Sequence, residues 1–589
     1  MAPRSDGSLA AGLAPSASPG RRRWSSVVRW VPSLAIGAVL AYLVVVPIAL
    51  MLLSSVRPGG FPLDPGLTLG HYASVYGDPG FPALLWATVE FGVGSSVVAL
   101  AIGLGLAWLI ERTDLPARGV VRVLILLPMA TPPLLMAIAW AMLLSPRVGF
   151  INQILTDAFG LRTAPFNIYS MLGLIFVQGL AFVPTAYLIL APSFRNFDPS
   201  FEEAAMTSGA GTWRLIRRIL LPVLWPSILS AAVFLLMVSL VVFDVPGTLG
   251  TPAHITVLST RIYYLVSDSP GGIPLYGRVG ALAALFLVLL LALASAYHRL
   301  TLQAQRYRTV TGKAFRPRAM RLGRARPAAI LAVIAYFLLS VAAPVAALVW
   351  MSLMPYQTRI SWPALRLATF DNYRDLFVNG RVVASVAHSA AIAVSTATAV
   401  TVLALLVSWL AVRLKVPGGR VLDALAFAPV AIPGVMIGVA LVYVYLTLNG
   451  IVPIYGTIWI IVVAYVTQYL PFGSRTMSGV MLQLHPELEE AALTSGAGRV
   501  RILWRITLPL MWPAAAAVWI WVAAHALREL SSALMLQGRE NSVVPTLLWD
   551  YWAGGEPTRA AAVGVGLTLT LVLILGLWQA ASRRGTKFV

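Results

Sequence analysis

Residues able to carry out chemistry are few in this chain and form no catalytic pattern. The absence of cysteine excludes disulfides, thiol catalysis and cysteine-bound metals. Four of the six histidines, scattered without the spacing of metal ligands, are His298, His388, His485 and His525. Gly312-Lys313 is followed by Ala314 and lacks the earlier glycine of a phosphate-binding loop. We therefore expect no catalytic residue, no metal site and no cofactor bound by this chain.

Two charged segments carry the clearest pattern. EEAAMTSGAGTWRLIRRILLP begins at Glu202, and EEAALTSGAGRVRILWRITLP begins at Glu489, 287 residues later. From Glu202 to Pro226, 16 of 25 positions match the second copy. The apolar stretches around the copies match far less well, keeping mainly prolines and apolar character. A docking task shared by the two copies explains this better than helix packing does.

Local chemistry predicts the same shape for both copies. Pro199 and Pro486 suit the first turn of a helix, where a missing N–H costs little. The glutamates that follow lie where the helix dipole favours negative charge. Gly209 and Gly496 stand where a glycine ends a helix. We expect a short helix, a glycine turn and a second helix with exposed arginines, before Pro222 and Pro509 mark entry into the next apolar run.

Charges inside apolar runs are costly and mark candidate pathways for a solute. Four such residues are Glu90, Asp244, Arg528 and Glu529. Asp244 and the pair Arg528-Glu529 occur at nearly equivalent depth in two repeated halves, so Asp244 could pair with Arg528. The alternatives are a purely structural ion pair between the halves and interfacial residues that face water.

Composition requires a membrane. Hydrophobic residues make up 59% of the chain and charged residues only 11%, about half the charged share of a soluble domain. Repeated apolar runs of 20 or more residues indicate transmembrane helices, whereas a β-barrel would show short alternating segments. The twelve predicted runs are 31–55, 84–110, 119–144, 168–193, 219–246, 278–298, 327–352, 384–412, 421–447, 455–480, 508–534 and 559–581. The predicted fold is an all-α polytopic membrane protein.

The distribution of arginine and lysine predicts the orientation. The net charge is +21, and the basic residues cluster at the ends of apolar runs, which argues against nucleic-acid binding. The 299–326 segment holds nine Arg or Lys residues and no acid. With twelve helices the basic loops fall on one side, which the positive-inside rule makes the cytoplasm. Both termini and both repeated segments are then cytoplasmic.

An internal duplication divides the chain. Residues 184–226 align with 471–513 at an offset of 287, and an earlier block, including Pro128 with Pro429 and Pro132 with Pro433, aligns at an offset of 301. A longer outside loop near 145–168 accounts for the difference. We expect a disordered tail at 1–30, a first half at 31–298, a basic linker at 299–326, a second half at 327–581 and a tail at 582–589. Parallel halves suit a pathway at their interface.

The repeated segments resemble a known family. The pattern E-A-A-x3-G-x9-I-x-L-P looks like the signature of permease subunits in ATP-binding-cassette (ABC) importers. The first copy meets it with Glu203, Ala204, Ala205, Gly209, Ile219, Leu221 and Pro222, and the second with Glu490, Ala491, Ala492, Gly496, Ile506, Leu508 and Pro509. Most such permeases are separate six-helix chains, whereas this one resembles the fused version over 31–581, with the type I importer permease fold.

The resemblance implies the partners. Each copy, with Glu202 or Glu489 at its start, would be a coupling helix seated on a cytoplasmic ATPase, so two ATPase subunits would bind ATP and Mg²⁺. An extracytoplasmic solute-binding protein is implied as well, at the inner membrane of a bacterium. Alternating access would follow from ATP-driven approach of the two coupling segments.

Ferric iron is the expected substrate. The stretches 243–266 and 528–552 resemble the fused ferric-iron permeases, and permeases for thiamine, 2-aminoethylphosphonate and, more distantly, polyamines look similar there. Acidic residues near the path would suit a hard cation. A twelve-helix secondary transporter or a membrane enzyme is the rival class, but neither explains a repeated coupling segment.

Overall fold

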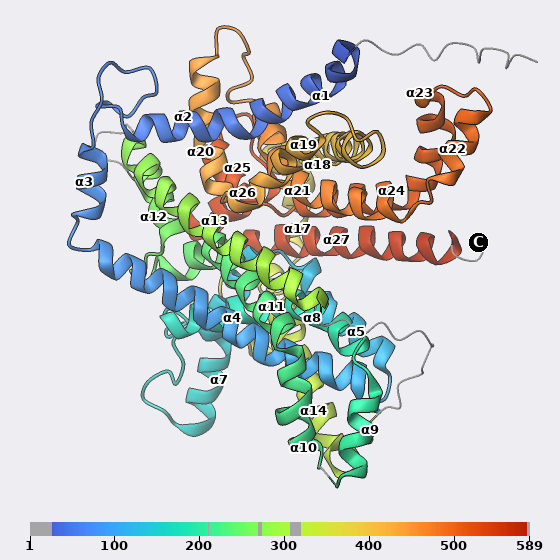
Figure 1. Ribbon diagram of the computed structural model, residues 1–589. Coiled ribbons are helices and arrows are strands. Elements are labelled where there is room, and N and C mark those ends of the chain that lie inside the picture. Colours follow the sequence, from blue (N-terminus) through green and yellow to red (C-terminus); the bar gives the residue numbers. More distant parts are fainter. Residues whose placement is uncertain (1–25, 210, 269–273, 307–319, 586–589) are drawn as a thin grey trace, which may run out of the picture.

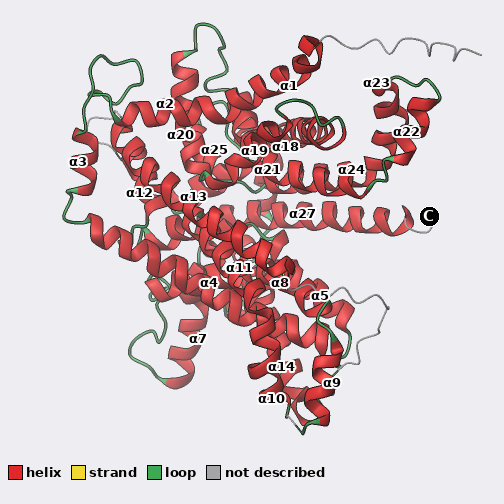
Figure 2. Ribbon diagram, viewed as in Figure 1, coloured by secondary structure: helices red, strands yellow, loops and turns green. Residues whose placement is uncertain are grey.

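The computed structural model describes residues 26–209, 211–268, 274–306 and 320–585, and 78% of it is helix with no strand in these ranges (Figures 1 and 2). This confirms the predicted all-α class. The helices of the first half are α1 (Ser26–Leu40), α2 (Val46–Ser55), α3 (Gly70–Tyr76), α4 (Phe81–Arg112), α5 (Arg118–Leu126), α6 (Pro133–Leu144), α7 (Phe150–Phe159), α8 (Met171–Arg195), α9 (Pro199–Thr207), α10 (Thr212–Leu215), α11 (Leu221–Val241), α12 (Leu258–Ser267) and α13 (Tyr276–Arg306).

The second half repeats this order, except that it lacks a counterpart of α7 and has an additional short helix, α16. Its helices are α14 (Arg326–Phe337), α15 (Ala343–Ser352), α16 (Trp362–Leu365), α17 (Asp371–Val378), α18 (Gly380–Ser408), α19 (Gly419–Phe427), α20 (Gly434–Thr447), α21 (Ile458–Gln483), α22 (Glu487–Thr494), α23 (Arg499–Ile502), α24 (Leu508–Ala526), α25 (Ser531–Leu536), α26 (Val544–Ala553) and α27 (Pro557–Gly585).

The count of membrane-spanning helices is close to the predicted twelve. By length and composition, nine helices of the described residues could cross a membrane, or eleven if each of two bent pairs is one span. The remaining predicted run, 455–480, forms the 26-residue helix α21, which carries Gln468 and Arg475 and is less apolar than the others. The predicted count of twelve is therefore not exactly confirmed.

Two of the predicted spans are broken rather than continuous helices. The run 119–144 bends by 93° between Ala130 and Pro133, and the run 421–447 bends by 111° between Val430 and Gly434. Proline lacks the N–H of the helix ladder and clashes with the preceding turn. Pro132 and Pro433 stand at the two breaks, 301 residues apart.

The two halves exchange their first helices. Helix α2 packs against α20 of the second half, and α15 packs against α6 of the first (Figure 1). The hydroxyl of Tyr42 bonds the hydroxyl of Tyr445 at 3.0 Å, and the hydroxyl of Tyr336 donates to the Ile125 carbonyl at 3.3 Å. The exchange makes each half part of the other's framework, so the halves form one structure.

The most extensive packing within each half joins its second and fourth long helices, α4 with α8 and α18 with α21. At the first crossing, Gly103 meets Ala186, and a Cβ on Gly103 would lie 2.7 Å from the Ala186 Cβ. At the second crossing the pair is reversed, and a Cβ on Gly473 would lie 3.1 Å from the Ala404 Cβ. Small residues allow such close approach of helices in membranes.

The predicted tails and linker lie partly outside the described residues. The structure leaves out 1–25 of the tail at 1–30, 307–319 of the linker at 299–326, and 586–589 of the tail at 582–589. The linker's first eight residues continue α13, which extends past the predicted limit of 298. Its described end is fixed to the first half, since Met320 N donates to the Arg112 carbonyl at 2.8 Å.

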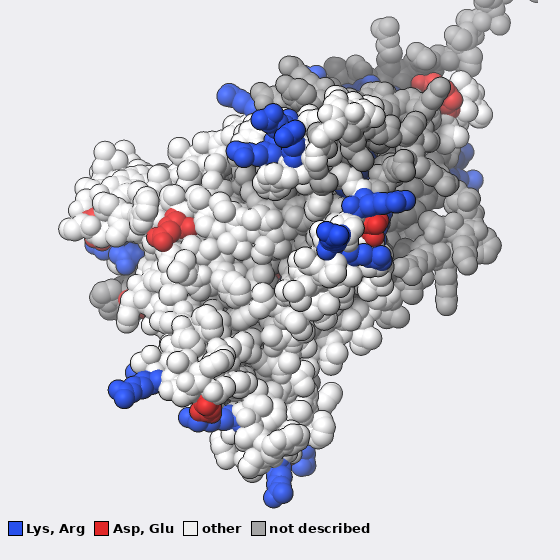
Figure 3. Space-filling model, turned by 90° about the horizontal axis from the view of Figure 1, so that it is seen from below, with Lys and Arg blue, Asp and Glu red and all other residues white. Residues whose placement is uncertain are grey.

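The outer surface fits a membrane environment. Figure 3 shows a face that is mostly uncharged, with Lys and Arg in a few separate groups. In Figure 1, α9 and α10 lie at the lower end of the view, α22 and α23 at the upper right and the end of α27 at the right, all away from α3 and α12 on the left. Both repeated segments therefore lie on the part of the molecule opposite α3 and α12.

The crossing of α4 and α8 yields a stability prediction. Replacing Gly103 by leucine should lower the free energy of unfolding by about 1–3 kcal/mol, because the added side chain must push the two helices apart. Gly105, on the same helix, has no atom within 4 Å of its Cβ position, so Gly105→Leu is the matched control. Thermal unfolding of the purified variants in detergent measures the difference, and equal effects would contradict this account of the packing.

Candidate functional site

Both repeated segments form the expected short helix and glycine stop. Helices α9 and α22 end just before Gly209 and Gly496, whose φ angles are +76° and +82°. In the second copy, Gly496 N donates to the Leu493 carbonyl and Ala497 N to the Ala492 carbonyl, both at 3.0 Å. These bonds close the helix end, and only glycine adopts the left-handed conformation there without strain.

The expected separate second helix is wrong in one respect. Instead of lying as an independent surface helix, α10 continues into α11, and α23 continues into α24, through the π-helical turns Ile216–Leu220 and Leu503–Thr507. Pro222 and Pro509 follow these turns by two residues. A proline removes an N–H from the ladder, and the local shift to i→i−5 bonding accommodates it. The segments are thus rigidly joined to the next span.

The signature residues occupy different environments. The side chains of Glu202 and Glu203 lie outside the described residues. Glu489 is partly buried, whereas Glu490 is exposed. The other signature side chains are exposed or half-buried except Ala205, which is buried; they are Ala204, Ala205, Ile219, Leu221, Pro222, Ala491, Ala492, Ile506, Leu508 and Pro509.

Apolar side chains are exposed at matching positions of the two copies. Phe201 is 45% exposed and Leu488, its equivalent, 52% exposed. Trp213 is 73% exposed and its equivalent Val500 63%. Figure 1 shows the two segments well apart, with α9 and α10 at the lower end of the view and α22 and α23 at the upper right. Such apolar residues on a surface otherwise rich in arginine are suited to contact with another protein.

Three of the four charges predicted on the path meet between the halves, at or next to breaks in the helices. The expected spans 219–246 and 508–534 end early, with α11 ending at Val241 and α24 at Ala526. Arg528 and Glu529 therefore lie in the break after α24, and Asp244 begins the helical turn that follows the break after α11. In the first break, the ring of Pro246 would clash with the carbonyl of residue 242 in a continuous helix.

Arg528 joins the second half to the first. Its guanidinium donates to the carbonyl of Met129, which belongs to the broken span of the first half. The α-helical partner of that carbonyl would be the N–H of residue 133, and the 3₁₀ partner that of residue 132, but both residues are prolines. Arg528 thus satisfies a carbonyl that the proline pair leaves without a helical donor.

Glu529 is held by two tyrosines of α21. The Tyr469 hydroxyl donates to Glu529 Oε2 at 3.1 Å, and the Tyr465 hydroxyl donates to the Glu529 carbonyl at 2.7 Å. Neither tyrosine, nor His525 beside them, stood out in the sequence, because isolated aromatic residues in apolar runs resemble ordinary core.

The tautomer of His525 follows from its neighbours. An Arg528 nitrogen lies 2.9 Å from His525 Nε2, and a guanidinium has only donors, so Nε2 accepts. His525 Nδ1 then carries the proton and donates to the Trp521 carbonyl at 2.8 Å. The imidazole is neutral, and Arg528 remains the positive charge of this group.

The predicted pair of Asp244 with Arg528 is wrong. No ion pair joins them among the described residues, since Arg528 is taken by Met129 and His525. Asp244 is nevertheless close enough to interact electrostatically with Arg528 and Glu529. Glu90 lies exposed on α4 and takes no part in this cluster.

An aromatic contact also closes the interface near Asp244. Phe243 lies 5.1 Å from Tyr263 of α12 and 5.5 Å from Trp549 of α26, measured between ring centroids. Burial raises the pKa of the Tyr263 hydroxyl, which stays neutral. A Cβ on Gly247 would lie 2.9 Å from the Phe243 ring, so the turn after Asp244 needs glycine.

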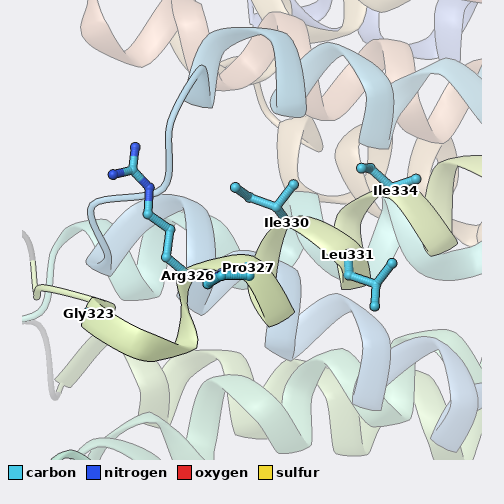
Figure 4. A pocket seen from close by; sticks show the side chains of 6 residues that line it. All are labelled: Gly323, Arg326, Pro327, Ile330, Leu331 and Ile334. Carbon is cyan, nitrogen blue, oxygen red and sulfur yellow. The ribbon is translucent and has the colours of Figure 1, made fainter.

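Other parts of the described structure offer no rival site. No group of three His, Cys, Asp or Glu residues in these ranges could hold a metal ion. A groove of about 530 Å³ lies along α14, lined by Gly323, Arg326, Pro327, Ile330, Leu331 and Ile334 (Figure 4). Its lining comes from one helix face with no carboxylate, as expected of a surface that contacts lipid.

Comparison with known proteins places the chain in a family. The pattern of the binding-protein-dependent transport system inner membrane component matches twice, at residues 99–308 and 406–587. Each match contains one repeated segment, which confirms the two-half organisation.

Individual relatives agree with this at modest identity. The ferric transport system permease protein FbpB of Actinobacillus pleuropneumoniae is 25% identical over 80% of this chain and 66% of its own length. A probable ABC transporter permease protein, y4fN, of Sinorhizobium fredii is 25% identical over 81% of this chain and 83% of its own length. The chain thus spans about two thirds of the FbpB relative.

Among solved structures, a bacterial ABC transporter that imports the acidic polysaccharide alginate matches 45% of this chain and 97% of its own at 18% identity and a TM-score of 0.37. The family assignment rests on the two sequence matches. The chain belongs to the binding-protein-dependent transport system inner membrane component family, and is a fused two-half permease subunit of an ABC importer rather than an enzyme.

Proposed function

We propose that this chain is the permease of a ferric-iron importer at the inner membrane of a bacterium, with both termini in the cytoplasm. Two copies of a cytoplasmic ATPase dock on the repeated segments, and an extracytoplasmic binding protein delivers the solute. The ATPases bind ATP and Mg²⁺, and this chain supplies the path.

One observation carries the docking part of this proposal. The two segments repeat the same helix, the same left-handed glycine and the same exposed apolar positions, Phe201 with Leu488 and Trp213 with Val500. Each segment continues directly into a span, so a movement of the short helix is transmitted to the interface between the halves. Two equal surfaces on one side suit two copies of one motor protein.

The ferric substrate is supported by the relatives and by the chemistry between the halves. Three of the relatives are named as ferric permeases. Asp244 and Glu529 place two carboxyl groups beside one guanidinium, and hard cations favour oxygen ligands. The described residues form no tight metal site, which suits a conduit that must release its solute.

Alternating access follows from this arrangement. ATP binding brings the ATPases together, and the repeated segments approach each other with them. The interface held by Arg528 and Met129 then opens toward the binding protein, and ATP hydrolysis restores the closed state.

Uptake by the whole complex tests the substrate. The chain, with the ATPase and binding protein encoded beside it, should take up radiolabelled ferric citrate in an ATP-dependent manner in proteoliposomes. Uptake of thiamine, 2-aminoethylphosphonate or spermidine in place of iron would overturn the ferric assignment and leave the importer intact.

The glycine stops test the docking. Gly209→Val with Gly496→Val should abolish ATP-dependent uptake without affecting membrane insertion, because a β-branched residue at positive φ costs about 1–2 kcal/mol in each helix end. Gly211→Val with Gly498→Val is the matched control, since these neighbours lack a positive φ and have open space around them. Undiminished uptake by the Gly209/Gly496 variant would refute coupling through these segments.

Arg528 tests the contact between the halves. Arg528→Gln should lower the free energy of unfolding by about 1.5–3 kcal/mol, because the Met129 carbonyl loses its charged donor. Arg539→Gln, an exposed arginine 11 residues later, should leave stability unchanged. Thermal unfolding of both purified variants measures the difference. If Arg528→Gln unfolds at the same temperature as the wild type, this bond does not hold the interface.

A further inference from the structure

We propose that Arg112 and Arg413 are positioning residues for transport, because each one fastens a coupling segment to the second long helix of its half. The proposal rests on the docking role of the segments given above. It assigns a task to two arginines that the sequence marks only as basic residues at span ends.

In the second half, one guanidinium holds both sides of the bend that leads into the coupling segment. Arg413 ends the π-helical turn Trp409–Arg413, which continues α18. Its Nη2 donates to the Leu484 carbonyl at 2.9 Å, just past the end of α21. Its Nε lies 3.1 Å from Oε1 of Glu489, in the first turn of α22.

The first half holds the same bend in the same way. Arg112 is the last residue of α4, and its Nη1 donates to the Phe197 carbonyl at 3.2 Å and the Phe194 carbonyl at 3.4 Å. Its guanidinium also lies 5.4 Å from the centre of the Phe197 ring. Phe197 is the middle one of the three residues between α8 and α9.

The hydrogen bonds of Arg112 and Arg413 lie at equivalent positions of the two halves. Arg413 follows Arg112 by 301 residues, and Leu484 follows Phe197 by 287, so two blocks of different offset converge on the same contact. The surroundings differ: Glu111 pairs with Arg122 at 3.0 Å in the first half, where the second half has Val412 and Asp423. The bond recurs although its neighbours do not, which favours a role common to both coupling segments.

The residue type fits the task. The last carbonyls of a helix lack helical donors, and a guanidinium offers five N–H groups in a rigid fork and stays charged when buried. Arg112 is 2% exposed, and the Arg413 and Glu489 side chains are 11% and 19% exposed. A lysine would supply the charge without the fork.

The two glutamates of the second copy, Glu489 and Glu490, have different contacts and therefore different roles. Glu489 turns toward the protein, where it receives a hydrogen bond from the Thr507 hydroxyl at 2.9 Å and faces Arg413. Glu490 is exposed and remains available to a docked partner. The first glutamate thus anchors the segment, and α18, α21, α22 and the start of α24 are tied together at one point.

Distance measurements on the permease alone test the anchor without any ATPase. Because the chain has no cysteine, Ser495→Cys in the coupling segment and Val402→Cys on α18 give two clean spin-label sites. Both positions are exposed. Arg413→Gln should raise the fraction of molecules with a displaced segment about tenfold, the loss of one charge-assisted contact.

Two further variants keep the result interpretable. Arg475→Gln is the matched control, because Arg475 pairs with Asp423 at 3.1 Å on the same span end and does not touch the coupling segment. Arg413→Lys should be intermediate, since charge without the fork holds Glu489 but not the Leu484 carbonyl. An unchanged distance distribution in Arg413→Gln would overturn the proposal whatever docks on the segment.

The second readout is coupling in the complete complex. Arg413→Gln and Arg112→Gln should each lower uptake per ATP hydrolysed about tenfold while the complex still assembles and hydrolyses ATP. A general folding defect would instead reduce the yield and both activities together, and would count against a positioning role. A displaced segment with unchanged uptake per ATP hydrolysed would also count against a positioning role.

Discussion

Backbone carbonyls that lose their helical donors inside a membrane protein must find donors within it. The proline pair at 132–133 frees the Met129 carbonyl, and the helix ends at Phe197 and Leu484 free two more. An arginine side chain donates to each of these carbonyls: Arg528 to Met129, Arg112 to Phe197 and Arg413 to Leu484. The bent spans, the contact between the halves and the attachment of the coupling segments all depend on this use of arginine.

The helix packing is duplicated in the two halves, but the charged residues between the halves are not. The crossings of α4 with α8 and of α18 with α21 use the same glycine–alanine pair in reversed order, so the frame is nearly symmetric. Between the halves the symmetry ends, since the positions equivalent to Arg528 and Glu529 are Val241 and Val242. One set of charges at the interface suits a single path, while two equal coupling segments suit two copies of a motor.

Much of the fold could be predicted from the residues. Apolar runs determine the helices, the two offsets determine the halves, and the glycines of the repeated segments sit at positive φ as expected. Hydropathy does not show the breaks after Val241 and Ala526, because it averages composition over a run. Only the first break has a signal in the sequence, which is Pro246. The predicted pairing of Asp244 with Arg528 is wrong because Arg528 donates to the Met129 carbonyl instead. Every residue has a backbone carbonyl, so the sequence does not indicate which one will accept. For the same reason, the sequence indicates Arg112 and Arg413 only as basic residues that set the orientation in the membrane, and not as donors to backbone carbonyls.

The central claim is that two coupling segments move together when the motor binds ATP. Spin labels at Ser208→Cys and Ser495→Cys, equivalent exposed positions of the two segments in a cysteine-free chain, report their separation in the assembled complex. The account predicts a shorter label-to-label distance in the ATP-bound, hydrolysis-blocked complex than in the nucleotide-free one. An identical distance in the two states would contradict it.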